Sequence, residues 1–137
     1  MNKKFFISWI VIFIAWMGGS FLVHGTLLAD AYKALEPSGL VRPSEAQEAY
    51  LAYMILAHVL MSGAFVWIYQ QGRQSGDWIG QGIRFGLAVV LLAAVPTYLI
   101  YYAVQPWPAD LMVKQIVGDG ILVIILGMLV AFLNKTD

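Results

Sequence analysis

The chain has 137 residues, of which 61% are hydrophobic and 12% are charged, and its mean hydropathy is +0.75. This composition excludes most soluble classes and is typical of an integral membrane protein. Eight Lys and Arg residues balance eight Asp and Glu residues, so no basic excess is present to hold a nucleic-acid backbone. The chain has no Cys, which excludes disulfides and thiolate metal sites.

Four apolar stretches predict membrane-spanning helices. A bilayer core about 30 Å thick needs about 20 apolar residues in a helix, and the stretches at 5–28, 49–69, 85–105 and 111–133 meet that length. The first stretch follows Met-Asn-Lys-Lys, but it is longer than the roughly 7 to 15 apolar residues of a signal peptide, and we expect it to be retained. The sequence therefore predicts one all-α transmembrane domain over residues 1–137, an antiparallel four-helix bundle.

The polar segments between the spans predict the connections. Residues 30–48 are Pro-containing and rich in acidic residues, and we expect them to form the external loop. The Gly-rich run QQGRQSGDWIGQG predicts a polar turn, and QPWPAD predicts a tight link that cannot continue a helix. Links this short make neighbouring helices antiparallel.

The distribution of positive charge predicts the orientation. If both termini are cytoplasmic, five cations lie inside and three lie outside, which favours the N-in, C-in arrangement. The inside group is Lys3, Lys4, Arg73, Arg84 and Lys135, and the outside group is Lys33, Arg42 and Lys114. We expect a multi-pass protein of a bacterial inner (plasma) membrane.

Small residues predict where the spans pack, because they let helix backbones approach closely in lipid. Gly82 and Gly86 form a pair four residues apart near the start of the third span, and further small residues occur on every span. This pattern predicts helix packing inside the bundle and indicates nothing about partners.

The polar residues inside the spans are the candidates for a functional site, because an ionisable group in hydrocarbon is costly. Asp119 lies about 12 Å below the outer end of the fourth span and His58 about 14 Å below that of the second, at 1.5 Å per residue. Thr97, next to Pro96, falls near the same level, whereas His24 lies only about 6 Å deep. Gln115 precedes Asp119 by one helical turn.

These residues predict a polar pocket in the outer half of the bundle. We expect it to contain His24, His58, Thr97, Gln115 and Asp119, with Tyr98 or Tyr101 as further candidates. The central expectation is a pair between Asp119 and His58, since a short carboxylate cannot reach water from this depth. Such a pair either ties the helices together or binds a small polar or protonic ligand.

Three functions are compatible with this site. The favoured one is a non-enzymatic accessory or binding subunit with a polar outer-leaflet site around His58 and Asp119. The alternatives are a proton-coupled small-solute carrier or channel, and a redox subunit in which His24 and His58 ligate haem b. No cofactor is predicted in the favoured case, and the sequence leaves a metal undetermined. The expected partners are the lipid bilayer and either a second copy of the chain or a larger membrane complex.

One stretch, IFIAWMGGSFLVHGTLL, resembles the first helix of the four-helix protoporphyrinogen oxidase family of bacterial membranes, which has an Ala-Trp-Met-Ala-Gly-like run. That family has a His before the Trp, where this chain has Ser8 and Trp9. The resemblance covers about a tenth of the chain and transfers no functional residue to it.

Overall fold

The computed structural model describes residues 2–135, and within this range the chain is helical and contains no strand. Four of its helices are long and apolar enough to cross a membrane: Lys3–Leu27, Ser44–Gly72, Trp78–Val104 and Ala109–Asn134. The chain is therefore an all-α membrane bundle, as the apolar stretches predict.

Each span is built from one or more helical segments. The first is α1 (Lys3–Ser20) followed by the π-helix η1 (Phe21–Leu27), and the second joins α3 (Ser44–Gln47) and the 3₁₀ turn η3 (Glu48–Tyr50) to α4 (Leu51–Gly72). The third comprises α5 (Trp78–Val89), the π-helix η4 (Val90–Ala94) and α6 (Val95–Val104), and the fourth is α7 (Ala109–Asn134). The long loop holds two short pieces, α2 (Ala29–Lys33) and η2 (Glu36–Ser38).

The start of the third span differs from the expectation. The Gly-rich run predicted to be a turn is helical from Trp78 onward, and Arg84 therefore lies inside the span. The Asp77 carboxylate accepts hydrogen bonds from the backbone N–H groups of Ile79 and Gly80, at 3.0 and 2.8 Å. This cap satisfies donors that a helix start leaves free. It offsets the low helix propensity of the glycines that follow.

The closest helix contact joins α5 to α7 through glycines. A Cβ atom on Gly82 would lie 2.6 Å from the Met128 Cα, and one on Gly86 would lie 2.7 Å from the Ile124 Cα. Gly127 of α7 faces the same contact from the other side. The expected packing role of Gly82 and Gly86 is thus confirmed, and it brings the two backbones into direct contact along this face.

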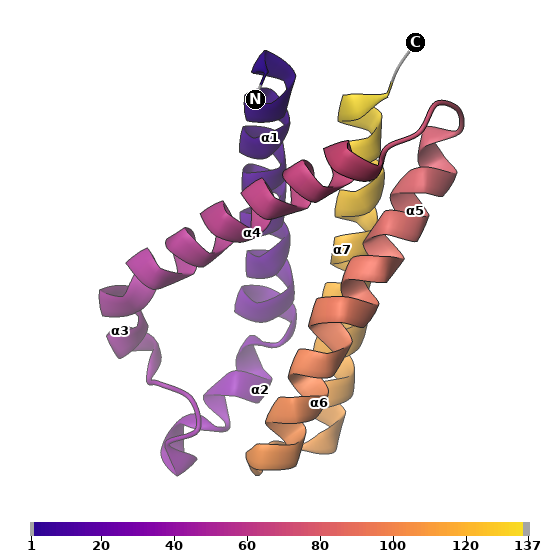
Figure 1. Cartoon of the computed structure of the whole chain (residues 1–137). Coiled ribbons are helices and arrows are strands. Elements are labelled where there is room, and N and C mark those ends of the chain that lie inside the picture. Colours follow the sequence, from indigo (N-terminus) through magenta and orange to yellow (C-terminus); the bar gives the residue numbers. More distant parts are fainter. Residues whose placement is uncertain (1, 136–137) are drawn as a thin grey trace.

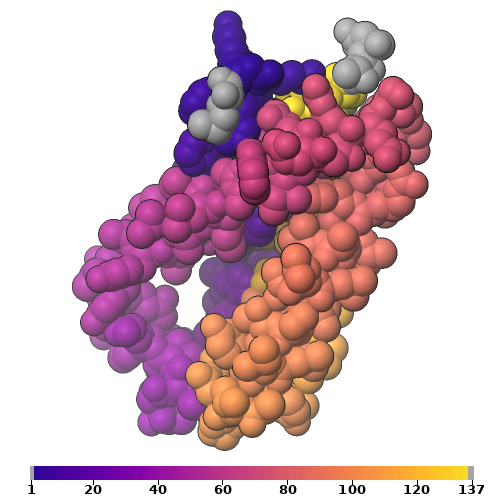
Figure 2. Space-filling model, viewed as in Figure 1, coloured from indigo at the N-terminus to yellow at the C-terminus, as the bar shows by residue number. Residues whose placement is uncertain are grey.

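The second span is attached to the bundle at one end. Phe65, Val66 and Tyr69 of α4 are buried in the core cluster, in which Phe65 lies 5.2 Å from Trp16 and 4.6 Å from Phe85 between ring centroids. Residues 51–57 are exposed, and α4 packs chiefly against α1. In Figure 1 this half of α4 diverges from α6, and Figure 2 shows the opening between them.

The two ends of the bundle differ in what they carry. The start of α1 and the end of α7 lie at one end, called here the termini end, together with the turn between α4 and α5, as Figure 1 shows. The opposite end, called the loop end, carries α2, η2 and the link between α6 and α7. Even numbers of spans require both termini on one side of a membrane, which agrees with this arrangement.

The orientation leads to a labelling prediction. Ser38 and Ser75 are exposed at the loop end and in the α4–α5 turn respectively. In intact cells, Cys at position 38 in S38C should react with a membrane-impermeant maleimide, and Cys at position 75 in S75C should react only after permeabilisation. The reverse pattern would show that the termini are outside.

Candidate functional site

A carboxylate inside the fourth span is the centre of a polar network at the loop end. Asp119 accepts a hydrogen bond from the Tyr98 hydroxyl through Oδ2, and its Oδ1 lies 2.9 Å from His24 Nε2. The three residues come from α7, α6 and η1. Asp119 therefore connects the first, third and fourth spans, and both of its oxygens have partners.

The network continues from His24 toward the loop. His24 Nδ1 lies 2.6 Å from the Tyr32 hydroxyl, and Gln115 Nε2 donates to the same hydroxyl at 3.0 Å. A proton arrangement that satisfies every contact has Tyr32 donating to Nδ1 and Nε2–H donating to Asp119. The five side chains then form one continuous hydrogen-bonded chain.

Two π-helical segments flank this network. His24 lies in η1. The wider turn of a π-helix rotates His24 away from the face on which it would lie if the α-helix continued past Ser20. In the third span, η4 precedes Pro96, which has no N–H to donate to the carbonyl of residue 92, and Tyr98 follows in the first turn of α6. π-Helical segments are rare overall, and those that do occur are frequently at functional sites.

The network is partly accessible. The His24 side chain is 30% exposed and that of Asp119 is 18% exposed, whereas Gln115 is 2% exposed. Tyr32, in the loop, has a pKa raised above 10 mainly by burial, with a further contribution from the Asp119 charge. Its hydroxyl therefore stays protonated at neutral pH and keeps both a donor and an acceptor for its neighbours.

The expected pair between Asp119 and His58 is wrong. His58 is 8% exposed and bonds elsewhere: Nδ1 donates to the Met54 carbonyl at 2.8 Å, and Nε2 lies 3.0 Å from Ser20 Oγ. His58 therefore joins α4 to α1. The depth estimate failed because it placed the outer ends of all spans at one level, whereas α7 extends beyond the end of η1 (Figure 1).

The remaining candidates are divided between the network and the surface. Gln115 and Tyr98 belong to the network, whereas Thr97 is exposed on α6 and Tyr101 stacks with Trp107 at 6.4 Å between ring centroids. Tyr32 is the member that the sequence analysis missed. A hydroxyl-bearing aromatic two turns after His24, at the start of the loop, is the signal that could have identified it.

The hydrogen-bond partners of the two histidines bear on whether the site could hold haem or a metal ion. Both ring nitrogens of His24 and both of His58 lie within hydrogen-bond distance of groups in the protein, so haem iron would have to displace one of these contacts on each histidine. Within residues 2–135, no group of three His, Asp or Glu side chains is arranged to hold a metal ion. The arrangement is suited to hydrogen bonding and proton exchange.

The fold and site together define an all-α, four-span membrane bundle with a polar network in its loop-end half. Comparison of the chain with family models, with curated proteins and with solved structures found no match.

Proposed function

We propose that this chain is a small non-enzymatic membrane subunit that takes up a proton, or a small cation that donates hydrogen bonds, at Asp119. The observation that carries the proposal is the contact of the Asp119 carboxylate with His24, 2.9 Å apart inside a membrane-spanning helix pair. Ionisable residues in such positions are costly and rare, and Asp–His chains in membranes typically carry protons.

The hydrogen-bonded chain supplies a route from the loop end to the carboxylate. When a proton from the loop end reaches the Tyr32 oxygen, Tyr32 can pass its own hydroxyl proton to His24 Nδ1 and stay neutral, and the resulting imidazolium shares its Nε2 proton with Asp119. Tyr98 holds the other carboxylate oxygen, so Asp119 changes its charge without losing its position. A site of this kind would let an accessory subunit respond to the proton concentration on one side of the membrane.

The location of this subunit is part of the same proposal. Helical bundles are the usual architecture of the bacterial inner membrane, whereas proteins of the outer membrane are closed β-barrels. Four apolar helices in a chain of 137 residues fit the inner membrane. The charge bias favours the loop end on the outside, which puts the Asp119 network in the outer half of the bilayer.

A proton-coupled carrier is the second candidate, and the shape of the bundle favours it. The loop-end half of α4 stands away from α6 (Figure 2), and the third span contains a π-helix beside Pro96. Such a break provides a hinge at which a helix can bend. A carrier needs both a mobile helix and a protonatable group beside the space that opens.

The test is infrared spectroscopy of the protein in nanodiscs at different pH values. All eight Asp and Glu residues contribute carboxylic acid C=O bands on acidification, so the spectrum of Asp119→Asn is subtracted from that of the wild-type chain. The difference should contain a C=O band that grows on acidification, while the helical content is kept. Asp110→Asn is the matched control, because Asp110 is on the same helix but is 68% exposed and paired with Lys114. A difference spectrum without a titrating C=O band would overturn the proposal.

Proton flux then separates the two candidates. In proteoliposomes with an entrapped pH dye, the subunit should give no flux above protein-free vesicles, although its carboxyl group titrates. Flux that disappears in Asp119→Asn and persists in Asp110→Asn would instead identify a carrier.

A further inference from the structure

A second polar site lies at the termini end, remote from the Asp119 network. A cavity of about 450 Å³ opens between the end of α4 and the first turns of α5, and it is open to the surroundings. The polar residues that line it are two Arg, two Gln and one Tyr, and the others are apolar or Gly. The lining residues are Ile68, Tyr69, Gly72, Arg73, Gln74, Gln81, Arg84 and Phe85.

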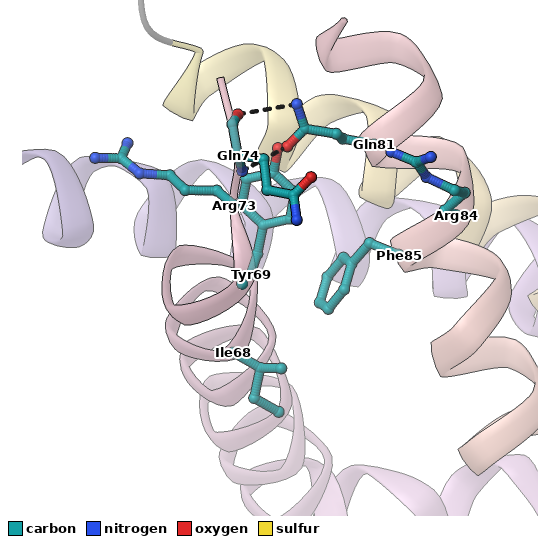
Figure 3. A pocket seen from close by; sticks show the side chains of 8 residues that line it. Ile68, Tyr69, Arg73, Gln74, Gln81, Arg84 and Phe85 are labelled. Atoms are coloured by element: carbon teal, nitrogen blue, oxygen red, sulfur yellow. Dashed lines mark hydrogen bonds between the residues drawn. The ribbon is translucent and has the colours of Figure 1, made fainter. Parts of the chain in front are cut away.

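Some polar side chains at the rim of this cavity are held by hydrogen bonds within the chain, and others are not. Gln81 is fixed by two hydrogen bonds to the Gln74 backbone, both 2.9 Å long, which Figure 3 shows as dashed lines. Arg73 donates to the Asn134 carbonyl at 3.0 Å, and its side chain extends away from α5 and from Arg84 in Figure 3. Within residues 2–135 no side-chain partner lies within bonding distance of the Arg84 guanidinium.

The floor of the cavity adds a second observation. Tyr69 is 6% exposed and packs on Phe85, with ring centroids 5.3 Å apart. Its hydroxyl makes no hydrogen bond within the described part of the chain and lies in the cavity lining. Tyr69 as a whole residue is buried, but its hydroxyl is accessible, so it is free to donate to an anion bound beside Arg84.

The position of the cavity in the membrane identifies the type of anion. Arg84 lies six residues inside the third span, about 9 Å along the helix, and its side chain extends toward Gln81 in Figure 3. This is the geometry of a cation that snorkels to the headgroup level. Ile68 is half exposed below the rim and continues the cavity into the lipid-facing surface.

We infer that this cavity binds the phosphate headgroup of an anionic phospholipid. Arg84 would bind the phosphate oxygens, and the Tyr69 hydroxyl would donate to the same group. The acyl chain would lie along Ile68. Charge supports this assignment. The start of α1 lies at this end (Figure 1) and carries Lys3 and Lys4, and the Lys4 ammonium donates to the Lys135 carbonyl at 3.0 Å. Basic residues near the bilayer surface attract anionic lipid.

The test measures lipid retention by native mass spectrometry of the purified protein in detergent. The wild-type chain should bind phosphatidylglycerol more tightly than phosphatidylcholine, and Arg84→Gln should weaken phosphatidylglycerol binding about tenfold, which is the effect of losing one charge-assisted contact. Phosphatidylcholine has the same phosphate but also a choline cation, so its binding should be weaker in the wild-type chain and should change less in Arg84→Gln. Arg84 is exposed, so the variant should fold, which circular dichroism can verify.

The matched control is Lys3→Gln, which removes one exposed cation from the same end. It should retain phosphatidylglycerol as the wild-type chain does. Equal losses in Lys3→Gln and Arg84→Gln, or equal affinity of the wild-type chain for both lipids, would overturn the assignment. Displacement of phosphatidylglycerol by sn-glycerol 3-phosphate at equal concentration would assign the site to a soluble phosphate ester instead.

Discussion

Gly86→Ala should lower the free energy of unfolding by about 3 kcal/mol, the upper part of the range for overpacking. The added Cβ would lie 2.7 Å from the Ile124 Cα and 2.9 Å from the Val123 carbonyl oxygen. These are backbone atoms, so no side-chain rotation can relieve the contact, and α5 must move away from α7. Reversible unfolding in mixed detergent micelles, followed by circular dichroism, measures the change.

Gly18→Ala is the matched control for this prediction. Gly18 is exposed on α1, and no atom lies within 4 Å of a Cβ built there. Replacing a glycine at such a helical site should raise stability by up to about 1 kcal/mol, because Ala has the higher helix propensity. Equal stabilities of Gly86→Ala and the wild-type chain would show that the two helices are not in direct backbone contact.

Asp119→Leu should destabilise the bundle by about 2 to 6 kcal/mol, the sum of two stranded polar groups at about 1 to 3 kcal/mol each. The substitution leaves the Tyr98 hydroxyl and His24 Nε2 without their partner. The substitution also removes a carboxylate that is costly in a membrane. This gain does not offset the loss, because Asp119 is in an apolar environment both in the bundle and after the helices separate, so its cost is the same in the two states. The same micelle unfolding assay measures it.

Removing the whole group should reverse most of that loss. The triple variant Asp119→Leu, His24→Leu, Tyr98→Phe contains no stranded donor on these three helices. The Tyr32 hydroxyl loses His24 but lies in the partly exposed loop, where it can bond water. Apolar replacements of a buried polar set are often neutral or stabilising. Its stability should lie within about 1 kcal/mol of the wild-type value, while the titrating band disappears. A triple variant as unstable as Asp119→Leu would mean that the network is required for folding.

Span number and span class could be predicted from the sequence because the length of an apolar helix is set by the thickness of the bilayer. The contact at Gly82 and Gly86 was also predictable, since few residue types permit backbone contact. The ends of the helices were harder to predict from the sequence. The third span begins seven residues before the predicted position because the Asp77 cap and the contact with α7 make a Gly-rich segment helical.

The site could be predicted in its members but not in its pairing. Asp119 and His24 are conspicuous as ionisable residues in apolar runs, and Gln115 follows from helical spacing. That Asp119 bonds His24 rather than His58 depends on the π-helix at Phe21–Leu27 and on the relative levels of two helices. Neither is encoded in local periodicity, because each arises from tertiary packing.

The one-ended attachment of α4 affects how stability is distributed along the chain. The buried contacts of this helix are concentrated toward its second half, from His58 to Tyr69, whereas residues 51–57 contribute no buried side chain. Amides in the first half are therefore protected only by the helix itself, and those in the second half share the global unfolding free energy. The helix thus behaves as two units, one that opens locally and one that separates only when the bundle unfolds.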